Sequence, residues 1–194
     1  KADGFAVKIS DSAPIRGKVG STKFVVRSAS NVNAQAQTPA WMVSRLKLAG
    51  MRSISIVVDI TNYVMLELGQ PIHAYDQSKV AGGLVVRRAI AGESLVTLDG
   101  QTRALHAEDL VIADDSGAIG IAGVMGGQST EVSSTTNSVL IESANFDGVS
   151  IARSARRHKL PSEASKRFER GVDPKVAEYA AARVVQLLED YAGA

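Results

Sequence analysis

The chain has 194 residues and contains no cysteine. This absence excludes a disulfide framework and a thiolate metal site, and it makes a cytoplasmic location the default expectation. No apolar run approaches the roughly 20 residues that a membrane-spanning helix needs. The chain opens with Lys-Ala-Asp-Gly, which is not a signal-peptide pattern and lacks an initiator methionine. We therefore expect a cytoplasmic protein without a membrane partner, and a piece of a longer chain.

The chain also has little net charge, because its 22 Lys and Arg residues nearly balance its 20 Asp and Glu residues. The hydrophobic share of 45% is that of an ordinary globular protein. The overall balance hides a basic segment from Arg153 to Arg170, which holds seven Lys or Arg and two Glu. Such a cluster indicates either a local anionic partner or a solvated helix face.

Helical patterns lie toward both ends of the chain, and strand patterns fill most of the middle. Helices are predicted from Thr38-Pro39 to Gly50, over 57–68, from Asp147 onward, and from Pro174 to Tyr191. Strands are predicted over 24–32, 84–88, 93–98, 101–105, 110–113, 118–122 and 139–144. This order predicts an α+β fold with central antiparallel or mixed β-sheets flanked by helices at both ends of the chain. Residues 1–22 are interpreted as an N-terminal extension or linker, and 23–194 as one domain.

The segment 59–76 combines an amphipathic helix with a polar exit. Gly69 follows the last apolar repeat and Pro71 comes soon after, a pattern that ends a helix. Thr61 and Asn62 are therefore predicted on the helix, and His73 on the loop that leaves it. Such loops often carry binding or catalytic groups, although a structural hydrogen bond from His73 is equally consistent with the sequence.

Three further positions are unusual in their context. Glu142 alternates onto the apolar face of its predicted strand, where a carboxylate needs an arginine partner, an edge position open to water, or a ligand to recognise. The glycines around Gly126 allow either a tight turn or a close approach of a ligand to the backbone. Ser162 is a natural helix N-cap beside basic residues, and helix N-termini favour anions.

The histidines do not form a metal-binding pattern. His73, His106 and His158 are far apart in sequence and lack the spacing of a zinc site, so no metal is expected. His106 is interpreted as a turn residue. His158 is interpreted as either a phosphate contact or a solvated side chain.

Together these motifs resemble one known family. The segments that carry the resemblance are Arg52-Ser-Ile-Ser, Val58-Asp-Ile-Thr-Asn-Tyr-Val, Gln70-Pro-Ile-His-Ala-Tyr-Asp, Gly123-Val-Met-Gly-Gly, Leu140-Ile-Glu-Ser-Ala, Ala155-Arg-Arg-His and Glu169-Arg-Gly-Val-Asp-Pro. In this order they resemble the bacterial phenylalanyl-tRNA synthetase β subunit, from about Phe24 to the end of the chain. The resemblance implies the central B3/B4 region, which edits tRNA by hydrolysing tyrosine wrongly esterified to the phenylalanine tRNA.

The resemblance also implies the site. His73 and Thr61 would be the catalytic residues, and Glu142 would accept a hydrogen bond from the tyrosine hydroxyl. The remaining substrate-binding residues would be Arg52, Asn62, Gly126, Ser162 and Ala164. Whether His73 is a general base or a positioning group stays open, because the ribose hydroxyl of the substrate could equally activate the water.

Partners and cofactors follow from the same resemblance. We expect mischarged tRNA as the substrate, no DNA, and the synthetase α subunit as partner in an α2β2 heterotetramer. No cofactor is expected in this domain, because ATP and Mg belong to the full synthetase. The alternative is a non-catalytic tRNA-binding or scaffolding module, in which the basic segment contacts tRNA and the pocket is inactive.

Overall fold

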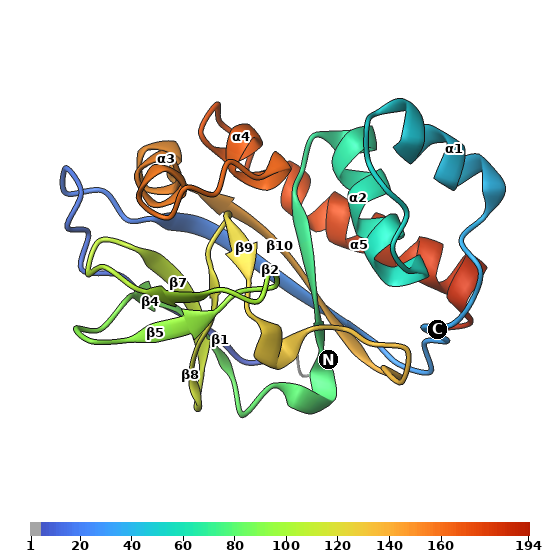
Figure 1. The fold of residues 1–194 in the computed structure, drawn as a ribbon, viewed down its shortest axis with the longest axis horizontal. Helices are drawn as coiled ribbons and strands as arrows, with labels where there is room; N and C mark the ends of the chain where they lie inside the picture. Colours follow the sequence, from blue (N-terminus) through green and yellow to red (C-terminus); the bar gives the residue numbers. More distant parts are fainter. Residues whose placement is uncertain (1–4) are drawn as a thin grey trace.

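The computed structural model describes residues 5–194. Two β-sheets stack on each other, and a layer of helices covers the outer face of one of them (Figure 1). The five-stranded sheet has the order β1 (Val7–Ser10), β4 (Leu84–Arg88), β7 (Leu110–Asp114), β8 (Gly117–Ile121) and β9 (Met125–Gly126). The three-stranded sheet has the order β2 (Ser21–Ala29), β10 (Val139–Phe146) and β3 (Ile72–Asp76). A separate hairpin pairs β5 (Ser94–Val96) with β6 (Thr102–Ala104).

The helices divide into two groups. The outer face of the three-stranded sheet is covered by α1 (Ala40–Leu48), α2 (Ile56–Leu68) and α5 (Val176–Ala192). The remaining helices, α3 (Gly148–Arg157) and α4 (Glu163–Phe168), lie beside the two sheets and contribute to the core between them. Two short 3-10 helices, η1 (Gln77–Lys79) and η2 (Gln128–Thr130), follow β3 and β9. Within residues 5–194, each helix is too short or too polar to cross a membrane.

The central strand β10 has both faces buried, so the molecule has two cores. Leu140 and Ala144 pack between the two sheets, whereas Val139 and Ile141 pack against the helical layer. This follows from the two-residue period of a strand, which sends successive side chains to opposite faces. Glu142 shares the face of Leu140 and Ala144, as predicted, and therefore points into the core between the sheets.

The predicted α+β class is confirmed, and several local predictions need correction. His73 does not lie on a loop, because β3 begins directly after Pro71 and pairs with β10. Thr38 does not cap α1, since its hydroxyl donates to Asp59 and the N-cap is Pro39. The last helix begins at Val176 rather than at Pro174. The end of α2 is as predicted, with Gly69 in the left-handed conformation at φ +71.

The N-terminal segment contributes to the five-stranded sheet. β1 pairs in parallel with β4 along its whole length. After β1, the carboxylate of Asp11 binds the guanidinium of Arg88, with Nε to Oδ1 at 2.8 Å. Both side chains of this ion pair are almost fully buried. The described part of the predicted extension 1–22 is thus joined to the rest of the fold.

Candidate functional site

A cavity of about 90 Å³ lies between the two sheets. It is enclosed by β3 and β10 on one side, by β8 and β9 on the other, and by α4. Its lining residues are Pro71, Ile72, His73, Tyr75, Ile112, Gly120, Ile121, Ala122, Gly123, Val124, Met125, Gly126, Glu142, Ala164 and Phe168. The ionisable side chains among them are His73, Tyr75 and Glu142, which come from the two neighbouring strands β3 and β10. The site is therefore an apolar cavity with one polar wall.

Glu142 is the acidic group of this wall. It lies opposite His73 of β3 and opposite Val26 of β2, and only 7% of its surface is exposed. The hydroxyl of Tyr75 donates a hydrogen bond to its Oε2. Burial disfavours the charged carboxylate and raises the pKa of Glu142 to about 7, although the Tyr75 hydrogen bond lowers it in part. Near neutral pH the carboxyl is thus divided between its charged and neutral forms.

His73 is the basic group of the wall. Its ring meets the ring of Tyr75 edge-on, with the centroids 4.5 Å apart at 83°. Among the described residues, no partner reaches its buried Nε2 within hydrogen-bond distance. Burial lowers the pKa of His73 to about 4, because it disfavours the imidazolium. At neutral pH the ring is neutral, and its unpaired Nε2 is buried beside Gly126.

Gly126 allows β9 to approach His73 closely. A Cβ at this position would lie 2.4 Å from Cε1 and 2.6 Å from Nε2 of His73. No side chain fits there unless the imidazole moves. The carbonyl of Gly126 also accepts from the amide of Leu98 at 3.0 Å, which ties β9 to the end of the hairpin. The glycine is therefore required by the packing of the cavity wall.

Ser162 and Ala164 form the α4 side of the site. The Ser162 hydroxyl accepts from the amide of Ser165 at 3.0 Å, as a helix N-cap does, and donates to the carbonyl of Val124 at 2.8 Å. Val124 and Ala164 both line the cavity. The predicted cap at Ser162 is confirmed, and it holds α4 against the turn before β9.

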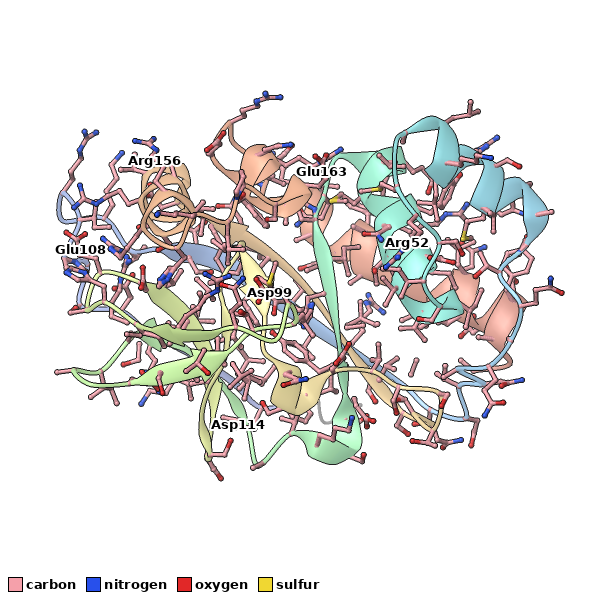
Figure 2. The ribbon with its side chains drawn as sticks, in the orientation of Figure 1. Arg52, Asp99, Glu108, Asp114, Arg156 and Glu163 are labelled. Atoms are coloured by element: carbon pink, nitrogen blue, oxygen red, sulfur yellow. The ribbon has the colours of Figure 1, made fainter. Side chains whose placement is uncertain are left out.

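Ser162 is not itself a lining residue of the cavity, and three further predicted site residues also lie outside it. Arg52 is an exposed residue of the connection before α2, and Figure 2 places its label on the helical side of the molecule. Thr61 is buried in α2, where its hydroxyl donates to the carbonyl of Val58 at 2.8 Å. Asn62 is the next residue of the same helix. The structure does not bring these residues into the cavity, and their roles stay predictions.

Tyr75 is the polar cavity residue that the sequence analysis missed. It lies two residues after His73, so in a strand both side chains share a face. The alternation of 72–76 indicates that His73 and Tyr75 share a face, but the interpretation of this segment as a loop does not use it. Tyr75 is only 1% exposed, and the combination of burial with the Glu142 carboxylate raises its pKa well above 10.

The basic segment is largely neutralised within the protein. Arg153 pairs with Glu108 at 2.7 Å, and Lys166 and Arg167 both pair with Glu163. Figure 2 shows Glu108 and Arg156 near the α3 end of the molecule. Within residues 5–194, the cations of the segment that make no ion pair are Arg156, Lys159 and Arg170.

The two remaining histidines are structural. His158 is neither a solvated side chain nor a phosphate contact, because it is buried with its Nε2 2.7 Å from Asp109. His106 lies in the turn before β7, as predicted, and its Nδ1 accepts from the amide of Glu108 at 3.2 Å. In the part of the chain that the structure describes, no three His, Asp or Glu side chains gather as a metal site would require.

The chain matches a known protein family along nearly its whole length. A family model described as the B3/4 domain matches residues 20–193. The phenylalanine–tRNA ligase β subunit of Leifsonia xyli subsp. xyli is 72% identical over 192 residues, which cover 99% of this chain and 23% of that protein. The corresponding subunit of Streptomyces avermitilis is 57% identical over 195 residues. The chain thus spans about a quarter of the length of the curated relatives it matches.

One solved structure shows the same fold. It is an N-terminal fragment of the phenylalanyl-tRNA synthetase β subunit from Pyrococcus horikoshii, with a TM-score of 0.51 and 13% identity. The match covers 78% of this chain and 48% of that one. At this low identity the likeness extends to the fold alone.

Proposed function

The chain belongs to the B3/4 domain family and corresponds to that region of phenylalanine–tRNA ligase β subunits, and on this basis we propose that its cavity is an editing site. The proposed reaction hydrolyses the ester between tyrosine and the phenylalanine tRNA. Water adds to the ester carbonyl, the bond to the ribose oxygen breaks, and the proton from water goes to that oxygen. The products are free tyrosine and uncharged tRNA, and no cofactor takes part.

The observation that carries this proposal is a carboxylate on the polar wall of a mainly apolar cavity. A cavity shaped for phenylalanine alone would reject an added hydroxyl by only about 100-fold. Glu142 reverses this preference, because a buried acceptor without a partner costs about 1–3 kcal/mol and a phenol supplies the partner. Phenylalanine has the same ring and cannot supply it. The proposed site therefore selects the wrong amino acid for removal.

The state of His73 favours positioning over proton abstraction. A general base works best when its pKa lies near the working pH, and the pKa of His73 is about 4. Its neutral Nε2 is buried beside Gly126, so a small shift of the ring is needed before it accepts a hydrogen bond from the attacking water or from the amino group of the substrate. The ribose hydroxyl next to the ester remains available to take the proton from water. Thr61, Asn62 and Arg52 do not line the cavity, and any contribution they make to the proposed reaction comes from outside it.

The proposal extends to the partners of the whole protein. We propose that the full-length β subunit pairs with the synthetase α subunit in an α2β2 assembly and receives the 3′ end of tRNA. Arg156, Lys159 and Arg170, which pair with no carboxylate among residues 5–194, are proposed to contact its phosphates.

The test compares hydrolysis of Tyr-tRNA and Phe-tRNA by the full ligase, as wild type and as Glu142→Gln. The wild type should cleave the tyrosine ester and spare the phenylalanine ester. Glutamine keeps the shape and loses the charge, so the tyrosine-to-phenylalanine preference should fall about 10- to 100-fold. Glu67→Gln is the matched control, because Glu67 binds Tyr63 and Arg183 on the helical side.

Three outcomes would count against the proposal in different ways. A wild type that binds tRNA and cleaves neither ester would support the non-catalytic scaffolding alternative. Equal loss of both hydrolysis rates in Glu142→Gln would make Glu142 a general base, for which a pKa of about 7 is suitable. Unchanged preference would remove Glu142 from recognition.

A further inference from the structure

We infer that Tyr75 is a positioning residue that sets the selectivity of Glu142 for a phenol ligand, an inference that rests on the function proposed above. The hydroxyl of Tyr75 holds one carboxylate oxygen of Glu142. The other oxygen is thereby presented to the cavity. The carboxylate that would bind the phenol of the substrate therefore already binds the phenol of Tyr75.

The two oxygens of Glu142 have different surroundings. Oε2 accepts from Tyr75. Within residues 5–194, Oε1 accepts no hydrogen bond. Oε1 is not fully buried, and Glu142 lines the cavity. Oε1 is therefore the oxygen within reach of a ligand. A carboxylate can accept several hydrogen bonds at once, so a ligand phenol can bind without displacing Tyr75.

Tyr75 is itself fixed in place. It lies opposite Leu140 in the pairing of β3 with β10, and it is almost completely buried. Its ring packs edge-on against His73 at a centroid distance of 4.5 Å. A recognition group is only as well placed as the residues that support it. Without the hydroxyl, the carboxylate could turn within the cavity and present either oxygen, or neither, to the ligand.

Tyr75 also affects the charge that the ligand meets. Its raised pKa keeps the hydroxyl protonated, so it remains a donor throughout the range in which Glu142 titrates. The hydrogen bond favours the ionised carboxylate, and its loss should raise the pKa of Glu142 further. The ionisable groups that face Glu142 are His73 and Tyr75 of β3. The described residues that line the cavity from β7, β8, β9 and α4 are apolar or glycine.

The experiment uses Tyr75→Phe in the full ligase, with Tyr63→Phe as the matched control. Tyr63 also donates its hydroxyl to a glutamate, Glu67, at 3.1 Å, but on the helical side of the three-stranded sheet. The kcat and KM for Tyr-tRNA and Phe-tRNA hydrolysis are measured between pH 6 and pH 9. The selectivity is the ratio of kcat/KM for Tyr-tRNA to kcat/KM for Phe-tRNA. This ratio cancels the general rise of ester hydrolysis with pH, because both esters share it.

The loss of a hydrogen bond to a charged group should lower this ratio about tenfold in Tyr75→Phe, chiefly through the KM for the tyrosine ester. The pH at which the ratio is half-maximal should also move upward. Tyr63→Phe should keep both the ratio and its pH midpoint.

A second comparison separates positioning from general damage to the fold. In a Glu142→Gln background the pH midpoint should be absent, and Tyr75→Phe should change the ratio far less than in the wild type. Equal effects of Tyr75→Phe in both backgrounds would overturn the inference, as would an unchanged ratio and midpoint in the single variant.

Failure of the proposed function gives a different result. If the wild type cleaves neither ester, the editing proposal fails, and binding of free tyrosine against free phenylalanine then tests Tyr75 directly. Weaker tyrosine binding in Tyr75→Phe with unchanged phenylalanine binding would still support its role at Glu142. Equal binding of tyrosine by both proteins would contradict it.

Discussion

At the scale of single residues, His73 and Glu142 show how burial sets the state of the cavity. Both are ionisable, and burial drives both toward their neutral forms. The pKa of the histidine falls to about 4 and that of the glutamate rises to about 7. The cavity wall therefore carries little positive charge near neutral pH, and its negative charge depends on pH. Groups whose pKa values are strongly shifted by burial, when they line one cavity, identify it as a candidate functional site.

Stability should respond to Glu142→Gln in a pH-dependent way. A carboxyl whose pKa is raised by folding contributes stability that is fully present below pH 4.5 and is lost as the pH rises through about 7. The rise from 4.5 to about 7 corresponds to roughly 3 kcal/mol. Glutamine does not ionise, so the variant should be more stable than the wild type by up to about that amount at pH 8.5. Urea unfolding at pH 4 and pH 8.5 measures the difference.

The control for this measurement is Glu67→Gln. The pKa of Glu67 is lowered, chiefly by its hydrogen bond with Arg183, so its replacement should bring no gain at high pH. A gain of equal size at both pH values for Glu142→Gln would show that packing, and not ionisation, is responsible.

Gly126→Ala should close the site from the β9 side. The added methyl would overlap the imidazole of His73, so the ring must leave its place beside Tyr75. We expect at least about a tenfold loss of tyrosine binding, the effect of losing one good hydrogen bond to a ligand. Gly120→Ala adds the same methyl to the same cavity, but its nearest neighbour, Gly126 Cα, is 3.5 Å away. It should weaken binding less, and equal losses would refute the steric account.

At the scale of elements, α3 is held to the rest of the fold through Asp109. This carboxylate is completely buried before β7, and it accepts hydrogen bonds from Ser154 at 2.7 Å, from Arg157 and from the backbone of His106. His158 completes the set at 2.7 Å. Burial alone would raise the pKa of Asp109, but these hydrogen bonds and charges outweigh it and the pKa is lowered.

Asp109→Ala should therefore be strongly destabilising. It leaves the Arg157 guanidinium and several donors without their buried partner, a loss that typically costs about 3–5 kcal/mol. Urea unfolding at pH 7 measures it. Glu178→Ala, which removes an exposed ion pair with Lys23, should leave the free energy of unfolding nearly unchanged. A small effect of Asp109→Ala would mean that α3 is held mainly by its apolar contacts.

The elements that sequence reasoning predicted correctly have strong local signals. α2 ends at Gly69, α3 begins after the cap Asp147, and the strands around Asp99-Gly100 follow a hairpin pattern. The missed strands lack such signals. β9 has two residues, and β1 pairs in parallel with β4, far along the chain. β3 follows α2 after a short Gly-Gln-Pro connection and is defined by its pairing with β10, which local sequence does not reveal.

Missing β3 also limited the prediction of the site. Alternation alone showed that Glu142 is an exceptional carboxylate on an apolar face, and the family resemblance supplied its predicted role. Tyr75 could not be identified, since its relation to Glu142 depends on the register between two strands distant in sequence. The family resemblance predicts that Thr61, Asn62 and His73 line the same site. In the structure, α2 packs on the other face of the three-stranded sheet from the cavity.

At the scale of the whole molecule, the three-stranded sheet separates the helical core from the core that holds the cavity. Its outer face packs against α1, α2 and α5 and forms a core lined almost entirely by apolar residues. Its inner face carries His73, Tyr75 and Glu142 into the cavity between the sheets. Because β10 is central and buried on both faces, it gives the Glu142 carboxylate a rigid support, as the proposed recognition role requires.

The measurement that tests this account most directly is a crystal structure of the protein with bound tyrosine, collected near pH 8. We expect the phenol of the ligand in the cavity between the sheets, with its oxygen about 2.6 Å from Glu142 Oε1. Tyr75 should remain on Oε2, and the ligand should lie beside the ring of His73. A tyrosine bound outside this cavity, or one whose hydroxyl points away from Glu142, would contradict the account.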